Sequence, residues 1–187
     1  HRFRLVYSKI EACQTIDEIE HPAVREILGH LDIDAGVEIH HDGDLPARSG
    51  MGSSSSFAVG LLHALYALKG QVCSKHQLAL EGIHIEQDRL KETVGSQDQV
   101  MAAHGGLNHI GFAKDGNITV SPVTLPVERV KALNDHLMLL YTGIKRTASD
   151  VAATYVNDIG LREQQLLSIK EMVHEGVSIL DSGDDLV

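Results

Sequence analysis

The sequence predicts a domain of the α+β class, in which strands and helices follow one another without the regular alternation of a doubly wound sheet. Three observations support this class. Apolar and polar residues alternate near the start of the chain, which is typical of strands buried on one face. Longer stretches carry apolar residues at helical spacing between capping signals. Asp115 and Gly116 separate two short apolar runs and predict a hairpin.

In the first half of the chain, short strands alternate with helices of increasing length. The first helix has Pro22 in its first turn, where the amide that proline lacks would have no partner. The long helix that follows is closed by Gly70, a residue type that often ends helices. The predicted elements are strands at residues 3–7 and 37–39 and helices at residues 17–31 and 54–68.

The second half begins with a helix whose start is marked by a capping box, Ser74 with Gln77. Residues 136–144 form an apolar run bounded by polar residues, and we expect them to be a buried strand. The other predicted elements are a helix at residues 75–91, a short helix within 94–106, hairpin strands at 106–112 and 117–125, and helices at 147–156 and 160–180.

Composition and charge restrict the classes of partner. The chain has 187 residues, of which 43% are apolar and 4% aromatic, with no tryptophan. The few aromatic residues argue against stacking platforms for nucleic acid, and the formal net charge of -10 argues against binding to polyanions or anionic membranes. We find no apolar run long enough to span a membrane and no signal-peptide pattern. Cys13 and Cys73 stand alone, so we expect reduced thiols in a cytoplasmic protein.

The stretch PARSGMGSSSSF, residues 46–57, has the chemistry of a phosphate-binding loop. The first turn of a helix leaves backbone N–H groups without partners and carries a partial positive charge, which attracts phosphates. Glycines let the backbone approach an anion and adopt positive φ, and a serine hydroxyl is able to reach a bound Mg²⁺. The residues expected to bind phosphate are Gly50, Met51, Gly52, Ser53, Ser54 and Ser55.

Other glycine-rich loops fit these residues less well. A Walker A loop needs lysine where Ser53 stands, and a dinucleotide fingerprint needs glycine where Ser55 stands. A nucleophile elbow needs glycine in place of Ser56. A serine-capped helix without a ligand remains an alternative, although a single serine would be enough for a cap.

Two acidic residues further along have the character that phosphoryl transfer requires. Glu86 lies four residues after Gly82 and eight after Leu78, which places it on the inward stripe of its predicted helix. Asp98 stands in the first turn of the next helix. From position alone, Glu86 is equally well explained as an acid at the edge of the stripe, and Asp98 as a partner of the helix dipole.

A basic pair follows the predicted buried strand. Lys145 and Arg146 are suited to a second anion, such as a phosphate already on a substrate, and Thr142 and Gly143 stand where ligand contacts are common. A solvated basic pair without a ligand explains Lys145 and Arg146 as well.

The glycine-serine loop resembles the Pro-x-x-x-Gly-Leu-Gly-Ser-Ser-Ala signature of the GHMP small-molecule kinases. Met51 replaces the usual Leu, and Ser55 takes the place of the usual Ala. The resemblance implies the family's ribosomal protein S5 domain 2-like α/β domain, followed by the start of a ferredoxin-like second domain. It also implies ATP as co-substrate and Mg²⁺. The matching residues are Pro46, Gly50, Gly52, Ser53 and Ser54.

The same resemblance implies roles for the acidic residues. Family members carry a Mg²⁺-binding Glu on a helix at a similar distance before a catalytic Asp. The resemblance therefore implies that Glu86 binds Mg²⁺ together with Ser53 or Ser54. Asp98 lies in a stretch similar to the Gly-x-x-Asp-Gln of sugar-kinase members. It would orient or deprotonate the sugar hydroxyl. The remaining residues expected to contact substrate are Thr142, Gly143, Lys145 and Arg146.

Longer stretches resemble one branch of the superfamily, the bacterial D-glycero-D-manno-heptose 7-phosphate kinases. They include IHHDGDLPARSGMGSSSSF, IEQDRLKETVGSQDQVMAAHGGLN and YTGIKRTASD. This implies transfer of phosphate to the anomeric hydroxyl of that sugar phosphate, giving the 1,7-bisphosphate for nucleotide-activated heptose and lipopolysaccharide. Alternatives are a fucose, galactose or mannose kinase and a non-catalytic sugar- or nucleotide-binding module. A histidine-rich metal protein is a third hypothesis, but the zinc-ligand spacings are not found.

The domain organisation follows from the same resemblance. We expect the GHMP N-terminal domain at residues 1–134 and the start of the C-terminal domain at residues 135–187. The family's first motif and its last glycine-rich loop, which both contribute to the active site, are not found in the sequence, so we expect a chain truncated at both ends and a fragment that need not be active by itself. The expected partners are ATP and a sugar phosphate, not nucleic acid or a membrane, and a homodimer remains open.

Overall fold

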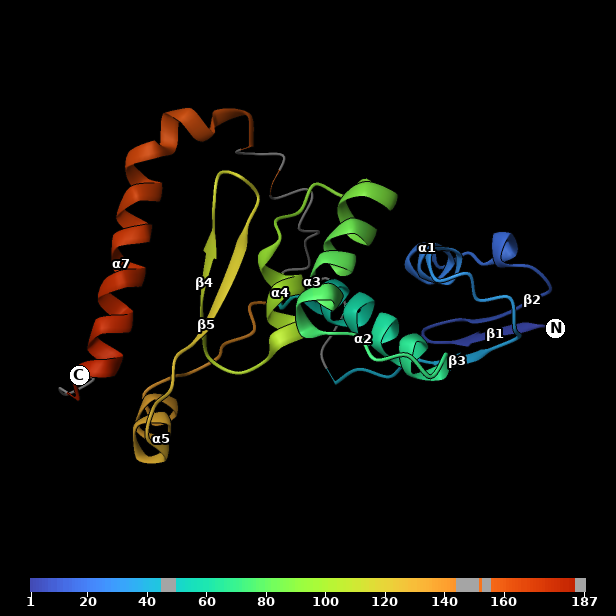
Figure 1. Ribbon diagram of the computed structural model, residues 1–187, viewed down its shortest axis with the longest axis horizontal. Helices are drawn as coiled ribbons and strands as arrows, with labels where there is room; N and C mark the ends of the chain where they lie inside the picture. Colours follow the sequence, from blue (N-terminus) through green and yellow to red (C-terminus); the bar gives the residue numbers. More distant parts are fainter. Residues whose placement is uncertain (45–49, 144–151, 153–155, 184–187) are drawn as a thin grey trace. The chain divides into compact units, whose positions relative to one another are not determined.

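The computed structural model describes residues 1–44, 50–143, 152 and 156–183, and the chain divides into two compact units (Figure 1). Unit 1 comprises His1–His104 with Gly143–Ala152, and unit 2 comprises Gly105–Thr142 with Ala153–Val187. Their mixed helices and strands agree with the predicted fold class. The boundary expected at residue 134 separates two domains of the kinase family, which need not coincide with these compact units. It stays a prediction.

Unit 1 contains a three-stranded sheet with the strand order β2-β1-β3. The middle strand pairs antiparallel with β2 and parallel with β3, in a register that sets Leu5 opposite both Glu11 and Ile39. The sequence predicts the first and third of these strands but not the second. The strands are β1 (Phe3–Val6), β2 (Ile10–Cys13) and β3 (Glu38–His40).

Strand β2 has an inverted burial pattern. Glu11 occupies the buried face, with 8% of its surface exposed, whereas Ile10 is 67% exposed. The Glu11 carboxylate accepts hydrogen bonds from the Tyr7 hydroxyl at 2.8 Å and from the backbone amides of Glu20 and His21 at 2.6 and 3.2 Å. These donors compensate for the burial of charge. Apolar alternation cannot reveal such a strand because the charged residue takes the inner position.

The helices of unit 1 supply most of its core. Ile27 and Leu28 of the first long helix and Leu62 of the second are fully buried and pack with Phe3 and Leu5 of β1. The helical segments are η1 (Ile16–Glu18, a 3₁₀ helix), α1 (Pro22–His30), α2 (Ser53–Leu68), α3 (Lys75–Ile83), η2 (His84–Arg89) and α4 (Gln97–His104).

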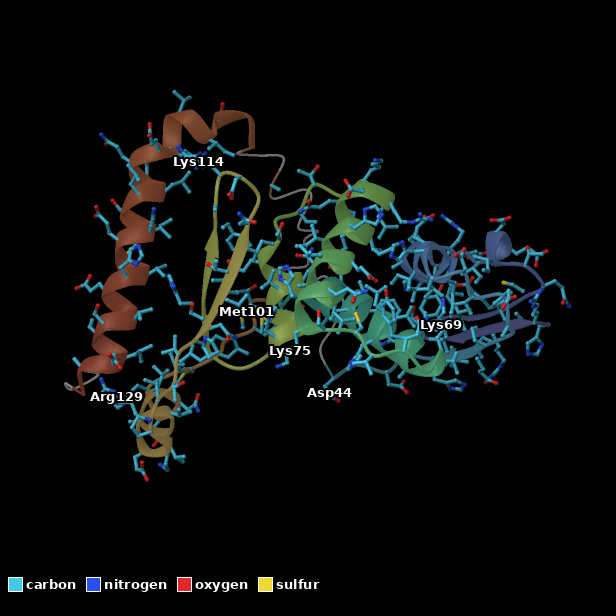
Figure 2. All side chains as sticks on the ribbon, viewed as in Figure 1. Asp44, Lys69, Lys75, Met101, Lys114 and Arg129 are labelled. Carbon is cyan, nitrogen blue, oxygen red and sulfur yellow. The ribbon has the colours of Figure 1, made fainter. Side chains whose placement is uncertain are left out.

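The end of α2 is tied to the end of α1. Lys69, labelled in Figure 2, is the C-cap of α2, and its ammonium group donates a hydrogen bond to the Leu31 carbonyl at 2.7 Å. Gly70 follows with a φ of 68°, as expected of a glycine that closes a helix. A lysine that satisfies a carbonyl at the end of a neighbouring helix fixes how α1 and α2 lie together.

The helix predicted over residues 75–91 is divided in two. α3 starts after Ser74, whose hydroxyl accepts a hydrogen bond from the Gln77 amide at 3.1 Å, as the capping signal predicts. α3 ends at Ile83, and the next six residues form the π-helical segment η2. π-helical turns are rare and are frequently found at functional sites. Here the turn carries Ile85 and Glu86, both of which are buried.

At Gly82, helix α3 packs closely against α2 and also contacts α4. A Cβ atom at this position would lie 2.9 Å from Val59 Cγ2 and 3.5 Å from Gln99 Cβ. Real Cβ atoms do not tolerate the first of these distances, so glycine permits the close approach of α3 to α2. As a result, the residues just after α3 come within reach of both neighbouring helices.

Unit 2 is built around a hairpin and two helices. The hairpin follows the predicted Asp115–Gly116 turn, and Gly116 has a φ of 88°. The Arg129 guanidinium donates a hydrogen bond to the Ile179 carbonyl at 2.7 Å, which satisfies a carbonyl near the end of the last helix. The elements are β4 (Asn108–Phe112), β5 (Ile118–Pro122), α5 (Val127–Asp135), η3 (Val156–Arg162) and α7 (Glu163–Ser182).

The prediction of a buried strand at residues 136–144 is wrong. Within the described residues 136–143, no strand forms, and Leu137, Met138, Leu139 and Leu140 are between 66% and 82% exposed. An apolar run becomes a strand only where a neighbouring strand takes its hydrogen bonds, and no such neighbour pairs with this run in the described part of the chain. α5, which precedes the run, is not predicted by the sequence. The helix predicted at 147–156 lies almost entirely outside the described residues.

Candidate active site

Helix α2 begins at a loop whose two glycines are left-handed. Gly50 has a φ of 76°, and Gly52, the N-cap of α2, has a φ of 67°. Side chains other than glycine rarely adopt this conformation. No side chain of the described residues caps the first amides of α2, which leaves these N–H groups for a ligand. Gly50 and Gly52 therefore have the positive φ that the sequence predicts, and the alternative of a serine-capped helix does not hold because glycine is the N-cap.

The four serines of the loop point in different directions. Ser53 is half-buried, Ser54 and Ser56 are exposed, and Ser55 is only 3% exposed. The Ser55 hydroxyl donates a hydrogen bond to Glu86 Oε2 at 2.8 Å. The sequence pairs Glu86 with Ser53 or Ser54, whereas the structure brings Ser55 to it.

Glu86 lies at the centre of a buried polar cluster. It is 2% exposed, and Gln99, which is 1% exposed, donates its side-chain amide to the same Oε2 atom that Ser55 contacts. The other side-chain atom of Gln99, Oε1, is buried and has no hydrogen-bond partner among the described residues. A buried carboxylate is tolerated when donors compensate for lost hydration, and charge-assisted hydrogen bonds are the strong ones.

Asp98 lies against the start of α2. A Cβ atom added to Gly52 would be 3.3 Å from Asp98 Oδ2 and 3.4 Å from its Cγ. The Asp98 side chain is exposed and belongs to the first turn of α4. The structure therefore brings Asp98, Glu86 and the glycine-serine loop together, with one acid exposed beside the loop and the other buried behind Ser55.

The connection from η2 to α4 is also held by specific contacts. The Gln87 side-chain amide donates hydrogen bonds to the Val94 carbonyl at 3.0 Å and the Ser96 hydroxyl at 3.2 Å. Partial desolvation raises the pKa of the Glu92 carboxyl, and the nearby negative charge of Glu86 raises it further. Sequence reasoning misses Gln87 and Gln99. Gln99 had one available signal, its place directly after Asp98 in a Gly-x-x-Asp-Gln stretch.

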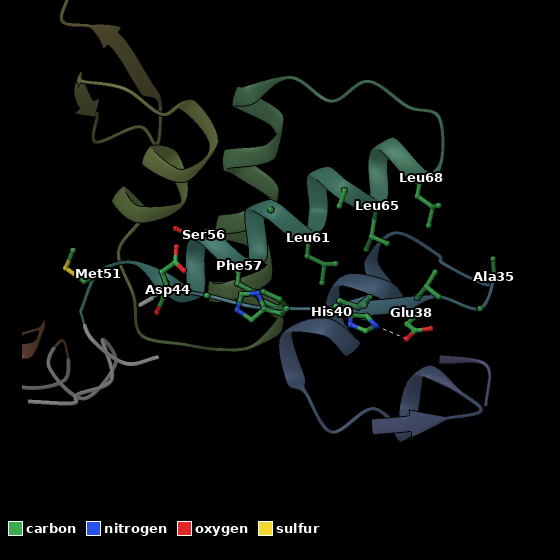
Figure 3. Close-up of a pocket in the computed structure, with 18 residues that line it drawn as sticks. Ala35, Glu38, His40, Asp44, Met51, Ser56, Phe57, Leu61, Leu65 and Leu68 are labelled. Carbon is green, nitrogen blue, oxygen red and sulfur yellow. Dashed lines mark hydrogen bonds and ion pairs between the residues drawn. The ribbon is translucent and has the colours of Figure 1, made fainter. Parts of the chain in front are cut away.

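A pocket of about 1120 Å³ opens beside the loop. It extends from Asp44, Met51 and Ser56 at the start of α2 toward Ala35 and Leu68 at the other end (Figure 3). Between these ends it is lined mainly by the apolar face of α2 and by β3. Sequence reasoning does not predict this pocket, because an apolar helix face is read as part of the core.

The remaining predicted substrate residues are Thr142, Gly143, Lys145 and Arg146. Thr142 and Gly143 are exposed and lie in different units, and Gly143 has a φ of 74°. Lys145 and Arg146 lie outside the described residues. The roles expected for these four residues stay predictions.

The described residues also bear on the other functional classes. They contain no group of three or more His, Cys, Asp or Glu side chains arranged to hold a metal ion. No helix among them is both long and apolar enough to cross a membrane.

The sequence around this site matches a known protein family. Residues 13–106, half of the chain, match the family model described as GHMP kinases N terminal domain. The chain belongs to the GHMP kinase family. The match includes the glycine-serine loop, Glu86 and Asp98, so the residues that converge at the start of α2 all lie within the family's N-terminal domain.

Two curated GHMP relatives are similar over part of their length. A D-glycero-alpha-D-manno-heptose 7-phosphate kinase from Campylobacter jejuni is 29% identical over 113 residues, covering 60% of this chain and 33% of the relative. An L-fucokinase/L-fucose-1-P guanylyltransferase from Bacteroides fragilis is 30% identical over 152 residues, covering 74% of this chain and 15% of the relative. The chain thus spans a third or less of these relatives.

Solved structures show the same fold. A D-glycero-D-manno-heptose 1-phosphate kinase from Bacteroides thetaiotaomicron superposes with a TM-score of 0.63 at 22% identity, over 70% of this chain and 47% of that one. A candidate sugar kinase from Campylobacter jejuni gives a TM-score of 0.65 at 19% identity, over 94% and 58%. At these identities the likeness concerns the GHMP kinase fold alone.

Proposed function

We propose that this chain provides the ATP-binding and catalytic part of a sugar kinase. The observation that carries the proposal is the convergence of Asp98 and Glu86 on the uncapped start of α2. A helix start with free amides binds phosphate, and phosphoryl transfer requires one acid for a metal ion and another for the acceptor hydroxyl. Family membership supports the same assignment.

The loop would hold the nucleotide's phosphates. The first amides of α2 point out of the helix start, and the left-handed Gly50 and Gly52 leave the backbone open to an anion. The neighbouring pocket, with Met51 and Ser56 at its near end, offers an apolar wall for the nucleoside. The exposed Ser54 and half-buried Ser53 would donate to phosphate oxygens.

The polar cluster fits Mg²⁺. The side chains of Glu86 and Ser55 present only oxygen atoms, which this hard cation prefers. When bound, Mg²⁺ would offset the charge that develops on the phosphates during transfer. Glu86 would hold it, together with Ser54, the loop serine expected from the sequence. Ser55 donates a hydrogen bond to Glu86 in the structure.

Asp98 would act on the acceptor. Its exposed carboxylate stands beside the loop, where it would accept the proton of the sugar hydroxyl as that oxygen bonds to phosphorus and ADP departs. The work of the protein is then mainly positioning, because the loop holds the donor and Asp98 orients the nucleophile.

We infer that the acceptor is D-glycero-D-manno-heptose 7-phosphate, phosphorylated at its anomeric hydroxyl for nucleotide-activated heptose and lipopolysaccharide synthesis. The similarity to the Campylobacter jejuni heptose 7-phosphate kinase supports a heptose phosphate, and the similarity to the Bacteroides fragilis fucokinase supports fucose as the alternative. Lys145 and Arg146 are the residues proposed for a phosphate on the acceptor. A cytoplasmic location and a homodimer stay predictions from the sequence.

The test is a coupled assay of ADP release on the 187-residue chain, with heptose, fucose, galactose and mannose, each with and without phosphate. We expect Asp98→Asn to lower kcat by about 100-fold or more, the usual contribution of a general base, while nucleotide affinity changes little. Asp115→Asn, in the hairpin turn of unit 2, is the matched control. Equal turnover in Asp98→Asn and wild type would contradict the assignment, whereas ATP binding without any turnover is the result expected both of a non-catalytic binding module and of a truncated kinase.

A further inference from the structure

The arrangement of donors around Glu86 is more specific than burial requires. Ser55 and Gln99 come from different helices, α2 and α4, yet both donate to the same atom, Oε2. Within the described residues, neither side chain donates to Oε1. A carboxylate that is held twice through one oxygen has its orientation fixed, and its second oxygen remains the one available to another ligand.

The chemical nature of the two donors is equally informative. A buried carboxylate is commonly paired with Arg or Lys, which would neutralise its charge and compete with a cation. A hydroxyl and an amide are neutral, so they orient Glu86 and leave its negative charge for a metal ion. This is how outer residues hold the ligating carboxylates of metal sites.

We propose that Gln99 and Ser55 are positioning residues that hold Glu86 in the orientation needed to bind Mg²⁺. This inference rests on the proposed function, and it assigns a role to Gln99, which the sequence analysis does not place in the site. It also gives a purpose to Ser55, where the family signature has Ala: the hydroxyl is a second donor to the metal-binding carboxylate.

The packing around Gln99 supports a fixed role. Its side chain is 1% exposed, and its Cβ and Cγ atoms pack next to Gly82 of α3. Its Oε1 atom is buried without a partner among the described residues, which is costly for an amide. An apolar residue would fill the same space without that cost, so the contact of Nε2 with Glu86 is the feature that only an amide supplies.

The experiment measures nucleotide binding with and without Mg²⁺, by calorimetry, using the 187-residue chain and a non-hydrolysable ATP analogue. The ratio of the two dissociation constants gives the Mg²⁺ coupling. Gln99→Met preserves the side-chain length and removes the donor, and we expect it to lower this coupling about 10- to 100-fold, the loss typical of outer-shell partners. Binding without Mg²⁺ should be unchanged, and turnover should recover at high Mg²⁺.

Two further variants complete the design. Gln97→Met, an exposed position two residues earlier in α4, should behave as wild type. Ser55→Ala removes a single hydroxyl and should lower the coupling in the same direction, so it tests the inference even where Gln99→Met fails to fold. Melting temperatures of all variants identify any general loss of structure.

The outcomes separate the inference from the proposed function. The inference alone fails where Glu86→Gln abolishes the Mg²⁺ coupling but Gln99→Met and Ser55→Ala leave it unchanged. It also fails where Gln99→Met and Ser55→Ala weaken nucleotide binding as much without Mg²⁺ as with it. Where Mg²⁺ does not strengthen binding to the wild type, or Glu86→Gln has no effect, the metal-binding role of Glu86 fails and the inference falls with it.

Discussion

At the scale of single residues, the site depends on the absence of a side chain at Gly52. Gly52 provides the left-handed N-cap of α2, and its lack of a Cβ leaves room for the Asp98 carboxylate. The two requirements are independent, since one concerns backbone conformation and the other contact. Few positions in the described chain combine a positive φ with a functional side chain so near.

Gly52→Ala should therefore damage activity more than stability. The new Cβ would lie 3.3 Å from Asp98 Oδ2, so the carboxylate must move, and the left-handed backbone adds a strain of about 1 kcal/mol. We expect a fall in kcat together with a modest loss in the free energy of unfolding, measured by ADP release and by urea titration. Gly70→Ala, at the other end of α2, is the control.

The control isolates the contact, because Gly70 has a φ of 68° and a Cβ added there would meet nothing within 4 Å. Gly70→Ala should show the same loss of stability with normal turnover. If both variants lost activity equally, backbone strain in α2 rather than displacement of Asp98 would be responsible.

His21 gives the protein a pH-dependent stability. Its Nδ1 accepts a hydrogen bond from the Val24 amide at 3.4 Å and so caps α1, and its ring packs against Tyr7 and Phe57. Burial lowers the pKa of His21 below 6.5, although the charge of Glu11 opposes the shift. The unfolded chain then binds more protons than the folded one just below pH 6.5, so stability falls as the pH is lowered through this window.

The comparison is between wild type and His21→Asn, which keeps a capping acceptor and does not titrate there. The free energy of unfolding of wild type should fall more between about pH 7.5 and pH 5 than that of the variant, because the other histidines are common to both. Parallel curves would show that His21 does not contribute to the pH dependence.

At the scale of elements, the tight meeting of α2, α3 and α4 positions the buried cluster. Because Gly82 has no side chain, α3 comes close to Val59 of α2, and the π-helical turn that follows carries Glu86 inward to meet Ser55 and Gln99. The cluster is thus assembled by helix packing rather than by any local sequence motif.

Gly82→Ala should disturb this packing. A methyl group 2.9 Å from Val59 Cγ2 overpacks the core, and we expect a loss of about 1–3 kcal/mol in the free energy of unfolding, measured by urea titration. Gly60→Ala, in α2, has nothing within 4 Å of the added Cβ and should instead gain stability from its better helix propensity. A neutral Gly82→Ala would show that α3 can move away without cost.

The elements also show what sequence reasoning is able to predict. The capping signal at Ser74, before α3, and the one at Gly70, after α2, are both confirmed, because a cap depends only on residues close in sequence. Strand β2 is missed because Glu11 faces inward, and the backbone amides that compensate its charge belong to a segment nine and ten residues later. The run at 136–144 is mistaken for a strand because pairing depends on a neighbour that the run itself does not reveal. In the site, the loop and Asp98 are recognisable from the sequence, whereas the pocket and the contact of Gln99 with Glu86 emerge only from packing.

At the scale of the whole molecule, the two units differ in how much they bury. The hydrophobic core cluster is made entirely of residues from unit 1. Among the described residues of unit 2, none is buried, and its hairpin and helices are held instead by contacts such as that of Arg129 with the Ile179 carbonyl. Of the residues proposed for the site, those of the glycine-serine loop, Glu86 and Asp98 lie in unit 1, the unit with the closely packed interior.

Asp98 and Gln99 are neighbours on one helix, so the roles proposed for them depend on the same turn of backbone. The residue that would take the acceptor's proton and the residue that would orient the metal-binding carboxylate share a rigid first turn of α4. A rotation or slide of α4 would misalign both at once, so an evolutionary change of sugar is easier through surfaces that leave this helix still. Diversification of such an enzyme should accordingly leave the α4 turn untouched while the walls around the sugar vary.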